Sequence, residues 1–371
     1  MANFSVEDQA MMLEALQLAL SAKGIADPNP CVGCVITKNH EIIGRGFTQA
    51  PGYHHAEIMA LHDAQLQGHE LEGATVYVTL EPCCHFGKTP PCTQALIAAK
   101  VAKVVIAAID PNPLVASKGV AELRHHGILV ETGLFELEAM MQNLGFMKRM
   151  KDGLPWVRLK MAASIDGITA LPNGKSQWIT HQEARADGHT WRAQASVLLT
   201  GIGTITADNP QMNVRGTLMT EQPLRAIIDS HLDIALDAKI LHNGRSIIFC
   251  ANPEKTTLDA KFKALQDLDI QVVQMPNAFG KVDLPRVMRY LAQEHSANEV
   301  HVEAGYKLNG SLLRENCIDE LLLYFSPMLL GQGAGLANLN ALESLPETQS
   351  WKFIDQQLIG SDLRLRLMKA I

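Results

Sequence analysis

The spacing of hydrophobic residues along the chain changes repeatedly between the period of a helix and that of a strand. A helical spacing runs from Ser5 to about Lys23 and predicts an amphipathic helix that ends at Gly24. Ser5 followed by Asp8 has the residue spacing of a capping box. The pair therefore predicts where this first helix begins.

From residue 31 onward, short strands and helices alternate. Strands are predicted over 31–37, 42–47, 75–80, 104–109 and 128–130, and helices after His55 and over 93–99 and 120–126. Alternation of this kind is typical of a mostly parallel sheet that helices cover.

The pattern changes around residues 148–155, where the charged and turn-forming segment KRMKDGLP precedes a new strand. Beyond it, strands are predicted over 156–161, 196–200, 225–229, 246–250, 271–275, 300–303 and 320–325, with helical stretches between several of them. We therefore predict two α/β domains, one over residues 1–147 and the other over residues 154–371.

Composition fits this organisation. A chain of 371 residues corresponds to two or three domains at about 150 residues each, and its 47% hydrophobic and 19% charged residues are typical of a globular protein. No apolar run reaches membrane-spanning length, and the N-terminus has no secretory pattern, so we expect a cytoplasmic protein without a membrane partner. The seven cysteines suggest thiols or metal ligands. A net charge of −7 offers no electrostatic footprint for nucleic acid.

The strongest chemical signal is His55-Ala56-Glu57, followed by Pro82-Cys83 and, later, Pro91-Cys92. One imidazole and two thiolates make a three-ligand set for zinc, which leaves the fourth coordination position for water, as in catalytic sites. Zinc lowers the pKa of such a water from 15.7 to about 7 in carbonic anhydrase, and the hydroxide can attack an amidine-like ring carbon. We predict that His55, Cys83 and Cys92 bind Zn²⁺.

Glu57 has a different predicted role. Residues i and i+2 of a helix point about 200° apart, so Glu57 is a poor partner for His55 on one ion. In the first helical turn it can reach the water and the substrate ring and carry the proton, as in the zinc nucleobase deaminases.

Eight residues separate Cys83 from Cys92, whereas the deaminase signature has two. Pro91 can begin a helix, and a Cys92 thiolate at its N-terminus would be favoured by the helix dipole. Cys84 remains a competing ligand. The pair Cys31 and Cys34 lies in a strand-like run, and we interpret it as two core or sheet cysteines.

The second half carries weaker signals. It has no GxGxxG between a strand and a helix, so a Rossmann fingerprint is absent. The turn that follows the strand over 300–303, at Gly305, can present backbone N–H groups to phosphates. Both this turn and the glycine-rich stretch over 331–335 fit two roles, a phosphate-binding turn or a plain connection.

Several motifs together resemble the bifunctional riboflavin-biosynthesis deaminase/reductases of bacteria. They follow the family's order along nearly the whole chain: PNPCVGCVI (28–36), HHAEIMAL (54–61), YVTLEPCCHFGKTPPC (77–92), DPNPLVASKG (110–119), LKMAASIDGITA (159–170), SQWIT (176–180), GTITADNP (203–210), IIDS (227–230) and VEAG (302–305). In that family the two cysteines are separated by this same long loop.

The resemblance implies an N-terminal cytidine-deaminase-like α/β/α sandwich and a C-terminal dihydrofolate-reductase-like α/β domain. The first would deaminate 2,5-diamino-6-ribosylamino-4(3H)-pyrimidinone 5′-phosphate, and the second would reduce the ribosyl group with NADPH. It also implies a homo-oligomer, a dimer or a tetramer.

The resemblance further assigns individual residues. In the deaminase half, substrate contacts fall on Asn29, His85 and Lys88. In the reductase half, NADPH contacts fall on Ala162, Trp178, Thr204, Asp208, Ser230 and Gly305. Substrate contacts there fall on Lys160, Ser176, Arg192, Met212, Arg215 and Glu303. Lys160 and Asp208 are candidates for positioning the ribose, and the two arginines offer the paired donors that suit a phosphate.

Two alternatives compete with this reading. One is a deaminase of nucleic-acid bases with an appended binding domain, against which the mild acidity counts. The other is a zinc-stabilised scaffold, whose closed site would need a fourth protein ligand such as Cys84 or His85.

Overall fold

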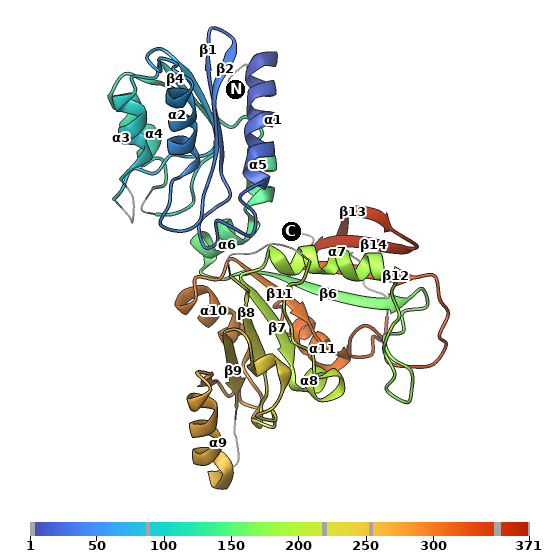
Figure 1. The fold of residues 1–371 in the computed structure, drawn as a ribbon. Coiled ribbons are helices and arrows are strands. Elements are labelled where there is room, and N and C mark those ends of the chain that lie inside the picture. The colour runs from blue at the N-terminus through green and yellow to red at the C-terminus, as the bar shows by residue number, and fades with distance from the viewer. Residues whose placement is uncertain are drawn as a thin grey trace. The chain divides into compact units, whose positions relative to one another are not determined.

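The computed structural model describes residues 4–86, 90–113, 115–216, 221–251, 255–344 and 350–369. The chain forms two compact units, Met1–Gly153 and Leu154–Ile371, each with its own sheet and helices (Figure 1). The division falls within the segment 148–155, where the hydrophobic pattern changes.

A five-stranded sheet in the order β2-β1-β3-β4-β5 forms the centre of the first unit. Its strands are β1 (Gly33–Lys38), β2 (Glu41–Phe47), β3 (Thr75–Leu80), β4 (Lys103–Ala108) and β5 (Leu129–Thr132). β3, β4 and β5 are parallel, whereas β1 is antiparallel to both of its neighbours. The expectation of a mostly parallel sheet is therefore met in only part of this unit, because β1 and β2 form a hairpin.

Helices cover both faces of this sheet (Figure 1). α1 (Val6–Leu20) and α5 (Glu136–Gln142) lie on one face, and α2 (Ala56–Leu66), α3 (Cys92–Ala98) and α4 (Lys118–His125) lie on the other. α6 (Leu144–Asp152) ends the unit. α1 stops at Leu20, so the prediction that it extends to about Lys23 is wrong by nearly one turn: residues 21–25 form turns.

Two glycines of β2 allow α2 to pack closely on the sheet. A Cβ atom at Gly44 would lie 2.3 Å from the carbonyl oxygen of Ala60, and one at Gly46 would lie 2.3 Å from that of Ala56. Any side chain at these positions would push α2 away from the sheet. The start of α2 carries His55 and Glu57, so this contact helps to set their position.

The predicted capping box is confirmed at the start of α1. Asp8 N donates to the Ser5 hydroxyl, and Ser5 N donates to the Asp8 carboxylate. The same carboxylate accepts from Tyr77 and pairs with Lys103. Although burial acts in the opposite direction, these hydrogen bonds hold the pKa of Asp8 below its usual value of 3.8.

We expect Asp8→Asn to lower the free energy of unfolding of the first unit by about 1–2 kcal/mol near neutral pH, since it weakens a cap and two further hydrogen bonds. Because the folded pKa is depressed, the carboxylate stabilises the fold above pH 3.8 and loses this effect as the pH falls through the folded value. Urea unfolding of both proteins measures the difference. An equal loss at neutral pH and well below pH 3.8 would contradict the electrostatic part of the argument.

A nine-stranded sheet in the order β10-β9-β8-β7-β11-β6-β12-β14-β13 forms the second unit. Its strands are β6 (Trp156–Ser164), β7 (Val197–Gly201), β8 (Leu224–Ile228), β9 (Ser246–Cys250), β10 (Gln271–Gln274), β11 (Glu299–Glu303), β12 (Glu320–Ser326), β13 (Trp351–Ile359) and β14 (Asp362–Lys369). The seven strands from β10 to β12 are parallel, as the alternating pattern predicts. The antiparallel hairpin β13–β14 completes one edge.

The helices of this unit follow individual strands. They are α7 (Gln182–Ala193), α8 (Ile202–Asp208), α9 (Lys255–Asp267), α10 (Leu284–Glu294) and α11 (Tyr306–Arg314). α8 follows β7 directly and α11 follows β11, and these two strands are neighbours in the sheet. Both helices thus begin at the carboxyl ends of adjacent parallel strands, where ligands bind in open α/β sheets. None of the helices in the described part of the chain has the length and apolarity that a membrane span needs.

Candidate active sites

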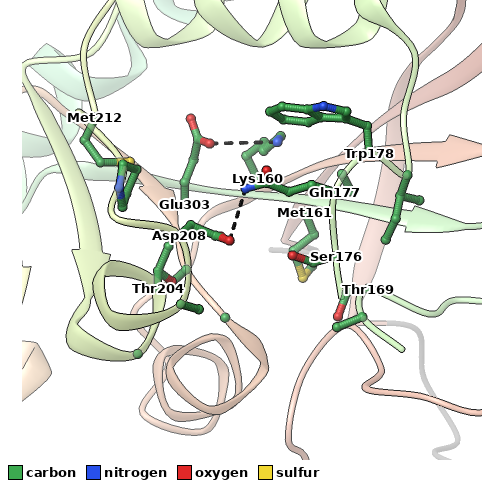
Figure 2. A pocket seen from close by; sticks show the side chains of 18 of the residues that line it. Lys160, Met161, Thr169, Ser176, Gln177, Trp178, Thr204, Asp208, Met212 and Glu303 are labelled. Atoms are coloured by element: carbon green, nitrogen blue, oxygen red, sulfur yellow. Dashed lines mark hydrogen bonds and ion pairs between the residues drawn. The ribbon is translucent and has the colours of Figure 1, made fainter. Parts of the chain in front are cut away.

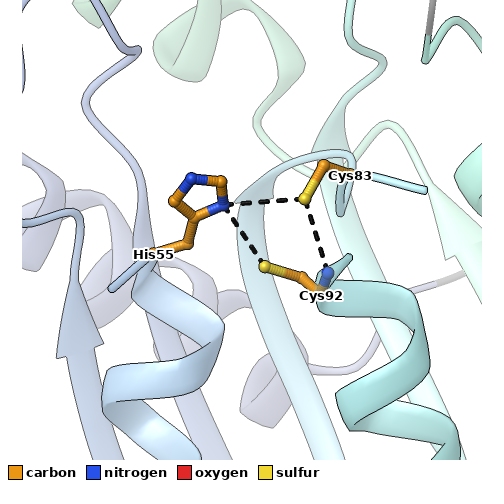
Figure 3. Close-up of side chains that lie close together, drawn as sticks. All are labelled: His55, Cys83 and Cys92. Atoms are coloured by element: carbon orange, nitrogen blue, oxygen red, sulfur yellow. Dashed lines mark hydrogen bonds between the residues drawn. The ribbon is translucent and has the colours of Figure 1, made fainter. Parts of the chain in front are cut away.

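Three side chains converge at one edge of the first unit's sheet (Figure 3). His55 Nδ1 lies 3.6 Å from Cys83 Sγ and 3.3 Å from Cys92 Sγ, and all three ligand atoms lie within 4.8 Å of one another. His55 and Cys83 are half-buried and Cys92 is buried. The structure thus places Cys83, rather than Cys84, in this cluster.

Local structure explains how the three residues meet. His55 is the N-cap of α2, and Cys83 follows the end of β3. Cys92 is the first residue of α3, directly after Pro91, and its backbone N–H donates to Cys83 Sγ at 3.4 Å. A helix N-terminus favours a thiolate at Cys83, whose sulfur accepts this N–H, whereas the hydrogen bond to Cys83 and then burial raise the pKa of Cys92 well above its usual value.

The cluster has the dimensions of a zinc site. With Zn–S bonds of about 2.3 Å and Zn–N bonds of about 2.0 Å, the ligand atoms of a tetrahedral site lie about 3.5 Å apart. The two His55–sulfur distances of 3.3 and 3.6 Å agree with this spacing. Within the described residues the cluster has three members, so the geometry leaves one coordination position open.

The two thiols differ in acidity. The pKa of Cys83 falls to about 4, chiefly because the Cys92 thiol hydrogen-bonds to its sulfur, with a further contribution from His55. Cys83 is therefore ready to act as a thiolate ligand without an external base.

Glu57, in the first turn of α2, is 4% exposed. Its pKa rises to about 7, because burial disfavours the carboxylate and the nearby Cys83 thiolate repels it. A carboxyl group with this pKa exchanges a proton readily at neutral pH, which is what a general acid–base residue requires.

The other predicted residues of the first unit lie outside the three-residue cluster or outside the described residues. Asn29 is half-buried in the turn before β1, and its backbone N–H donates to Ala26. His85 is half-buried in the loop after β3, outside the three-residue cluster. Lys88 lies outside the described residues. Cys34 belongs to the core in β1, whereas Cys31 precedes that strand and is half-buried, so the interpretation of this pair holds fully only for Cys34.

Glu81 was missed by the sequence analysis. This buried carboxylate accepts backbone N–H groups from Asp110, Ser117 and Val120, and so holds these three residues beside the end of β3. Glu81 stands two residues before Cys83, at the carboxyl end of a buried strand, which is the one sequence signal that could have indicated a structural role.

The second unit contains a pocket of about 800 Å³ at the carboxyl ends of β6, β7 and β11 (Figure 2). Most of the residues that the resemblance assigns to the reductase half line it: Lys160, Ala162, Ser176, Trp178, Arg192, Thr204, Asp208, Met212, Arg215, Glu303 and Gly305. They come from segments far apart in the sequence, which the parallel strands bring to one edge.

Ser230 does not line this pocket. Its hydroxyl accepts from Val282 N at 3.4 Å and its carbonyl accepts from Ala251 N, so it joins β8 to the segments beside it. The glycine-rich stretch also has a structural use: Asp166 accepts from Gly331 N, and Ala170 O accepts from Ala334 N. These N–H groups are therefore not free for a phosphate, whereas the turn at Gly305 stays on the pocket wall.

Three charged side chains lie together in the pocket lining. Arg192 forms a bidentate pair with Glu303, with 2.9 Å between Nη2 and Oε2, and Lys160 Nζ lies 3.8 Å from the same carboxylate. Although burial opposes it, Arg192 and then Lys160 hold the pKa of Glu303 well below its usual range. Glu303 is thus an anion between two cations.

The pocket lining also contains residues to which the sequence analysis assigned no contact. Gln177 Nε2 donates to Asp208 Oδ1 at 3.1 Å, and the Arg185 guanidinium lies 4.6 Å from the centre of the Trp178 ring. Tyr306 and Asn309, at the start of α11, also line the pocket. Gln177 lies within the SQWIT motif, but the contacts of these residues depend on which strands are neighbours, and no local signal indicates them.

Comparison with known proteins follows this division. Residues 5–108 match the cytidine and deoxycytidylate deaminase zinc-binding region, and residues 155–365 match the RibD C-terminal domain. The riboflavin biosynthesis protein RibD of Escherichia coli K12 is 40% identical over 98% of this chain and 100% of its own length. The chain belongs to the RibD family. The RibD protein of Haemophilus influenzae is also 40% identical, with 98% of each chain covered.

Solved RibD structures share the whole fold. Acinetobacter baumannii RibD has 40% identity and a TM-score of 0.89, with 98% of this chain and 99% of the other covered. A Thermotoga maritima diaminohydroxyphosphoribosylaminopyrimidine deaminase/5-amino-6-(5-phosphoribosylamino)uracil reductase has 31% identity and a TM-score of 0.87, with the same coverage. The chain is therefore a bifunctional riboflavin-biosynthesis enzyme, a deaminase and a reductase that use Zn²⁺ and NADPH. These comparisons favour the riboflavin-biosynthesis enzyme over the alternative of a deaminase that acts on nucleic-acid bases.

Proposed function

We propose that the first unit deaminates 2,5-diamino-6-ribosylamino-4(3H)-pyrimidinone 5′-phosphate at the His55–Cys83–Cys92 cluster, and that the second unit reduces the product in the pocket around Glu303. The observation that carries the first assignment is the cluster's three ligand atoms within 4.8 Å of one another, beside a buried Glu57. The pocket carries the second, since it gathers both predicted arginines and Lys160.

In the deamination, zinc supplies a water molecule that is acidic enough to react near neutral pH. Water adds to the ring carbon that carries the amino group, ammonia leaves, and an oxo group remains. Glu57 takes one proton from the water and delivers it to the ring nitrogen, and then moves the second proton, from the added hydroxyl group, to the departing amine. Asn29, His85 and Lys88 are proposed to hold the substrate.

In the reduction, bound NADPH would supply a hydride for C1′ of the ribosyl group, and the ring oxygen would leave C1′ and gain a proton to give the ribityl product. Lys160 and Asp208 are proposed to position the ribose, and Arg192 and Arg215 to bind the phosphate. Ala162, Trp178, Thr204 and the turn at Gly305 would contact NADPH. Ser230 is the weakest member of this set, because its polar atoms bond to segments outside the pocket.

One assay tests both assignments. The purified zinc-loaded chain is given the diaminopyrimidine ribosyl phosphate and NADPH, while ammonia release and NADPH oxidation are followed together. We expect ammonia to appear first and NADPH oxidation to depend on it. If neither signal appears, the proposed function is wrong; ammonia without NADPH oxidation would refute only the reductase assignment.

Arg215→Ala is expected to impair reduction and leave deamination unchanged. Arg215 lines the pocket, and its backbone N–H donates to His189 Nδ1 at 3.2 Å. Burial, and then Arg192 and Arg215, lower the pKa of His189 to about 4, so this ring is neutral at pH 7 and accepts the bond. Loss of one phosphate contact should raise the KM for the reductase substrate by about tenfold, measured by NADPH oxidation. Equal damage to ammonia release would contradict the two-site assignment.

We further propose that the enzyme is a cytoplasmic homo-oligomer, a dimer or a tetramer. Reduced thiolates at Cys83 and Cys92 are required for metal binding, which a reducing compartment provides.

β13 forms a sheet edge and exposes Phe353 and Leu358, which are 69% and 70% exposed. An apolar edge of this kind supports pairing with a second copy. Light scattering on the purified chain tests it, and a monomer at micromolar concentration would refute it.

A further inference from the structure

A layer of charged side chains lies between α7 and the sheet of the second unit, and two of its members, Lys160 and Glu303, also line the proposed reductase pocket. Successive strands contribute to one face of the sheet: Arg158 and Lys160 from β6, Glu299 and Glu303 from β11, Glu320 and Tyr324 from β12, and Arg364 and Arg366 from β14. Registers confirm this face, since Arg158 pairs with Glu320 and Tyr324 pairs with Arg364. We call these residues, with Asp187 and Trp191 of α7, the charged layer.

Asp187 connects three of its members. Its Oδ2 accepts from the Tyr324 hydroxyl at 2.5 Å and from Trp191 Nε1 at 3.3 Å. Both carboxylate oxygens also accept from Arg364 Nη1, at 3.0 and 3.1 Å. One carboxylate on α7 thus bonds to the helix itself and to two strands, β12 and β14.

Trp191 adds a second attachment of α7 to the sheet. Three guanidinium groups surround its ring: those of Arg158, Arg366 and Arg364 lie 4.6, 4.8 and 5.5 Å from the ring centre. The buried Glu320 pairs with Arg158 and Arg366 at 3.0 and 2.8 Å. The cations are therefore neutralised as well as stacked, and they hold the indole in one orientation.

This arrangement continues into the pocket along two paths. Tyr324 is 1% exposed, and Lys160 Nζ lies 5.8 Å from the centre of its ring. Trp191 is followed directly in α7 by Arg192, which reaches Glu303 and the carbonyl of Asn213. Both cations that flank Glu303 are thus adjacent to a side chain that Asp187 bonds, while Asp187, Tyr324 and Trp191 do not line the pocket.

We propose that Asp187 is a positioning residue of the reductase: through Tyr324 and Trp191 it holds Lys160 and Arg192 on either side of Glu303. The inference rests on the proposed role of this pocket in reduction. A misplacement of about 1 Å in groups that orient a substrate costs up to about a hundredfold in rate, so a residue without any substrate contact has a large effect.

Asp187→Asn is the first test, because it keeps the side-chain shape and removes the charge that Arg364 and Tyr324 share. Arg364 keeps Asp355 and Gln357 as partners, at 2.9 and 2.7 Å, which favours retention of the fold. Tyr324→Phe is the second, since it keeps the ring beneath Lys160 and removes only the hydroxyl. Glu183→Gln is the matched control: an exposed carboxylate in the first turn of the same helix.

Steady-state reduction is measured on the full zinc-loaded chain with NADPH and with NADPH deuterated at the transferred position, and rates are divided by the NADPH-binding sites titrated by fluorescence. We expect Asp187→Asn to lower the kcat per bound NADPH about tenfold and to raise the isotope effect, because slower hydride transfer becomes rate-limiting. Tyr324→Phe should show a smaller change in the same direction. Glu183→Gln should match the wild type, and ammonia release should be the same in all four proteins.

A purely structural role predicts a different result: fewer NADPH sites, with unchanged kcat per site and an unchanged isotope effect. That outcome in Asp187→Asn and Tyr324→Phe would overturn the inference while the proposed function stands. If the wild-type chain itself fails to oxidise NADPH with its substrate, the proposed function fails and this inference with it.

Discussion

Glu57→Ala is expected to lose deamination by a factor on the order of 10³ while it keeps its zinc. The residue is buried beside the cluster and hydrogen-bonds to Cys92, but the predicted ligand set of His55, Cys83 and Cys92 does not include it. Alanine removes the carboxyl group whose pKa of about 7 suits it to move the proton from water to the ring. Zinc is measured by metal analysis and deamination by ammonia release.

NADPH oxidation with the deaminated substrate serves as the internal control, since the reductase pocket lies in the other unit and should be unaffected. Glu57→Gln keeps the side-chain volume and should behave like Glu57→Ala. If either variant loses its zinc, Glu57 is a ligand and its role as the proton carrier is wrong.

Removal of zinc with a chelator should abolish deamination by a factor on the order of 10³ or more, while reduction of the deaminated substrate stays within about twofold. The cluster's ligand atoms belong to the first unit alone, so loss of the metal should not reach the pocket around Glu303. Added Zn²⁺ should restore ammonia release.

Cys83 and Cys84 are adjacent in the sequence, so alanine variants of the two provide a matched test of which cysteine binds zinc. Cys83→Ala should reproduce the effect of the chelator, because Cys83 Sγ lies 3.6 Å from His55 Nδ1. Cys84→Ala should retain both zinc and activity, since Cys84 lies outside the cluster. Zinc loss in Cys84→Ala with retention in Cys83→Ala would reverse the ligand assignment; loss in both would indicate a four-ligand scaffold site.

The two proposed sites depend on different levels of structure. The deaminase cluster is compact and built from two helix starts and one strand end, so its ligands are held by local backbone structure. The reductase pocket is assembled from β6, α7, β7, α8 and β11, and its charges depend on the contacts of α7 with the sheet. We therefore expect reduction to be more sensitive than deamination to substitutions outside its own site.

Sequence reasoning named the three residues that the structure brings together in the first unit, while their roles and that of Glu57 stay predictions. His55 with Glu57, and Pro91 with Cys92, mark helix starts through short-range chemistry, and the capping box of Ser5 and Asp8 does the same for α1. Most strands were also predicted to within a few residues, because buried parallel strands form continuous hydrophobic runs. α5, α6 and the hairpin β13–β14 were not predicted: α5 and α6 are short, and β13 is exposed along much of its length.

What the sequence by itself determined is the set of local signals: the candidate metal ligands, the candidate proton carrier, the alternating α/β pattern and the change of pattern near residue 150. What only the tertiary structure decided is the order of the strands, the antiparallel placement of β1, and which distant side chains meet. Hydrophobic periodicity indicates whether a residue is buried, but it does not indicate which residues pack against it. For that reason Gln177, Arg185 and Asp187 became visible only once the strands were assembled, and Ser230 proved to lie away from the pocket wall.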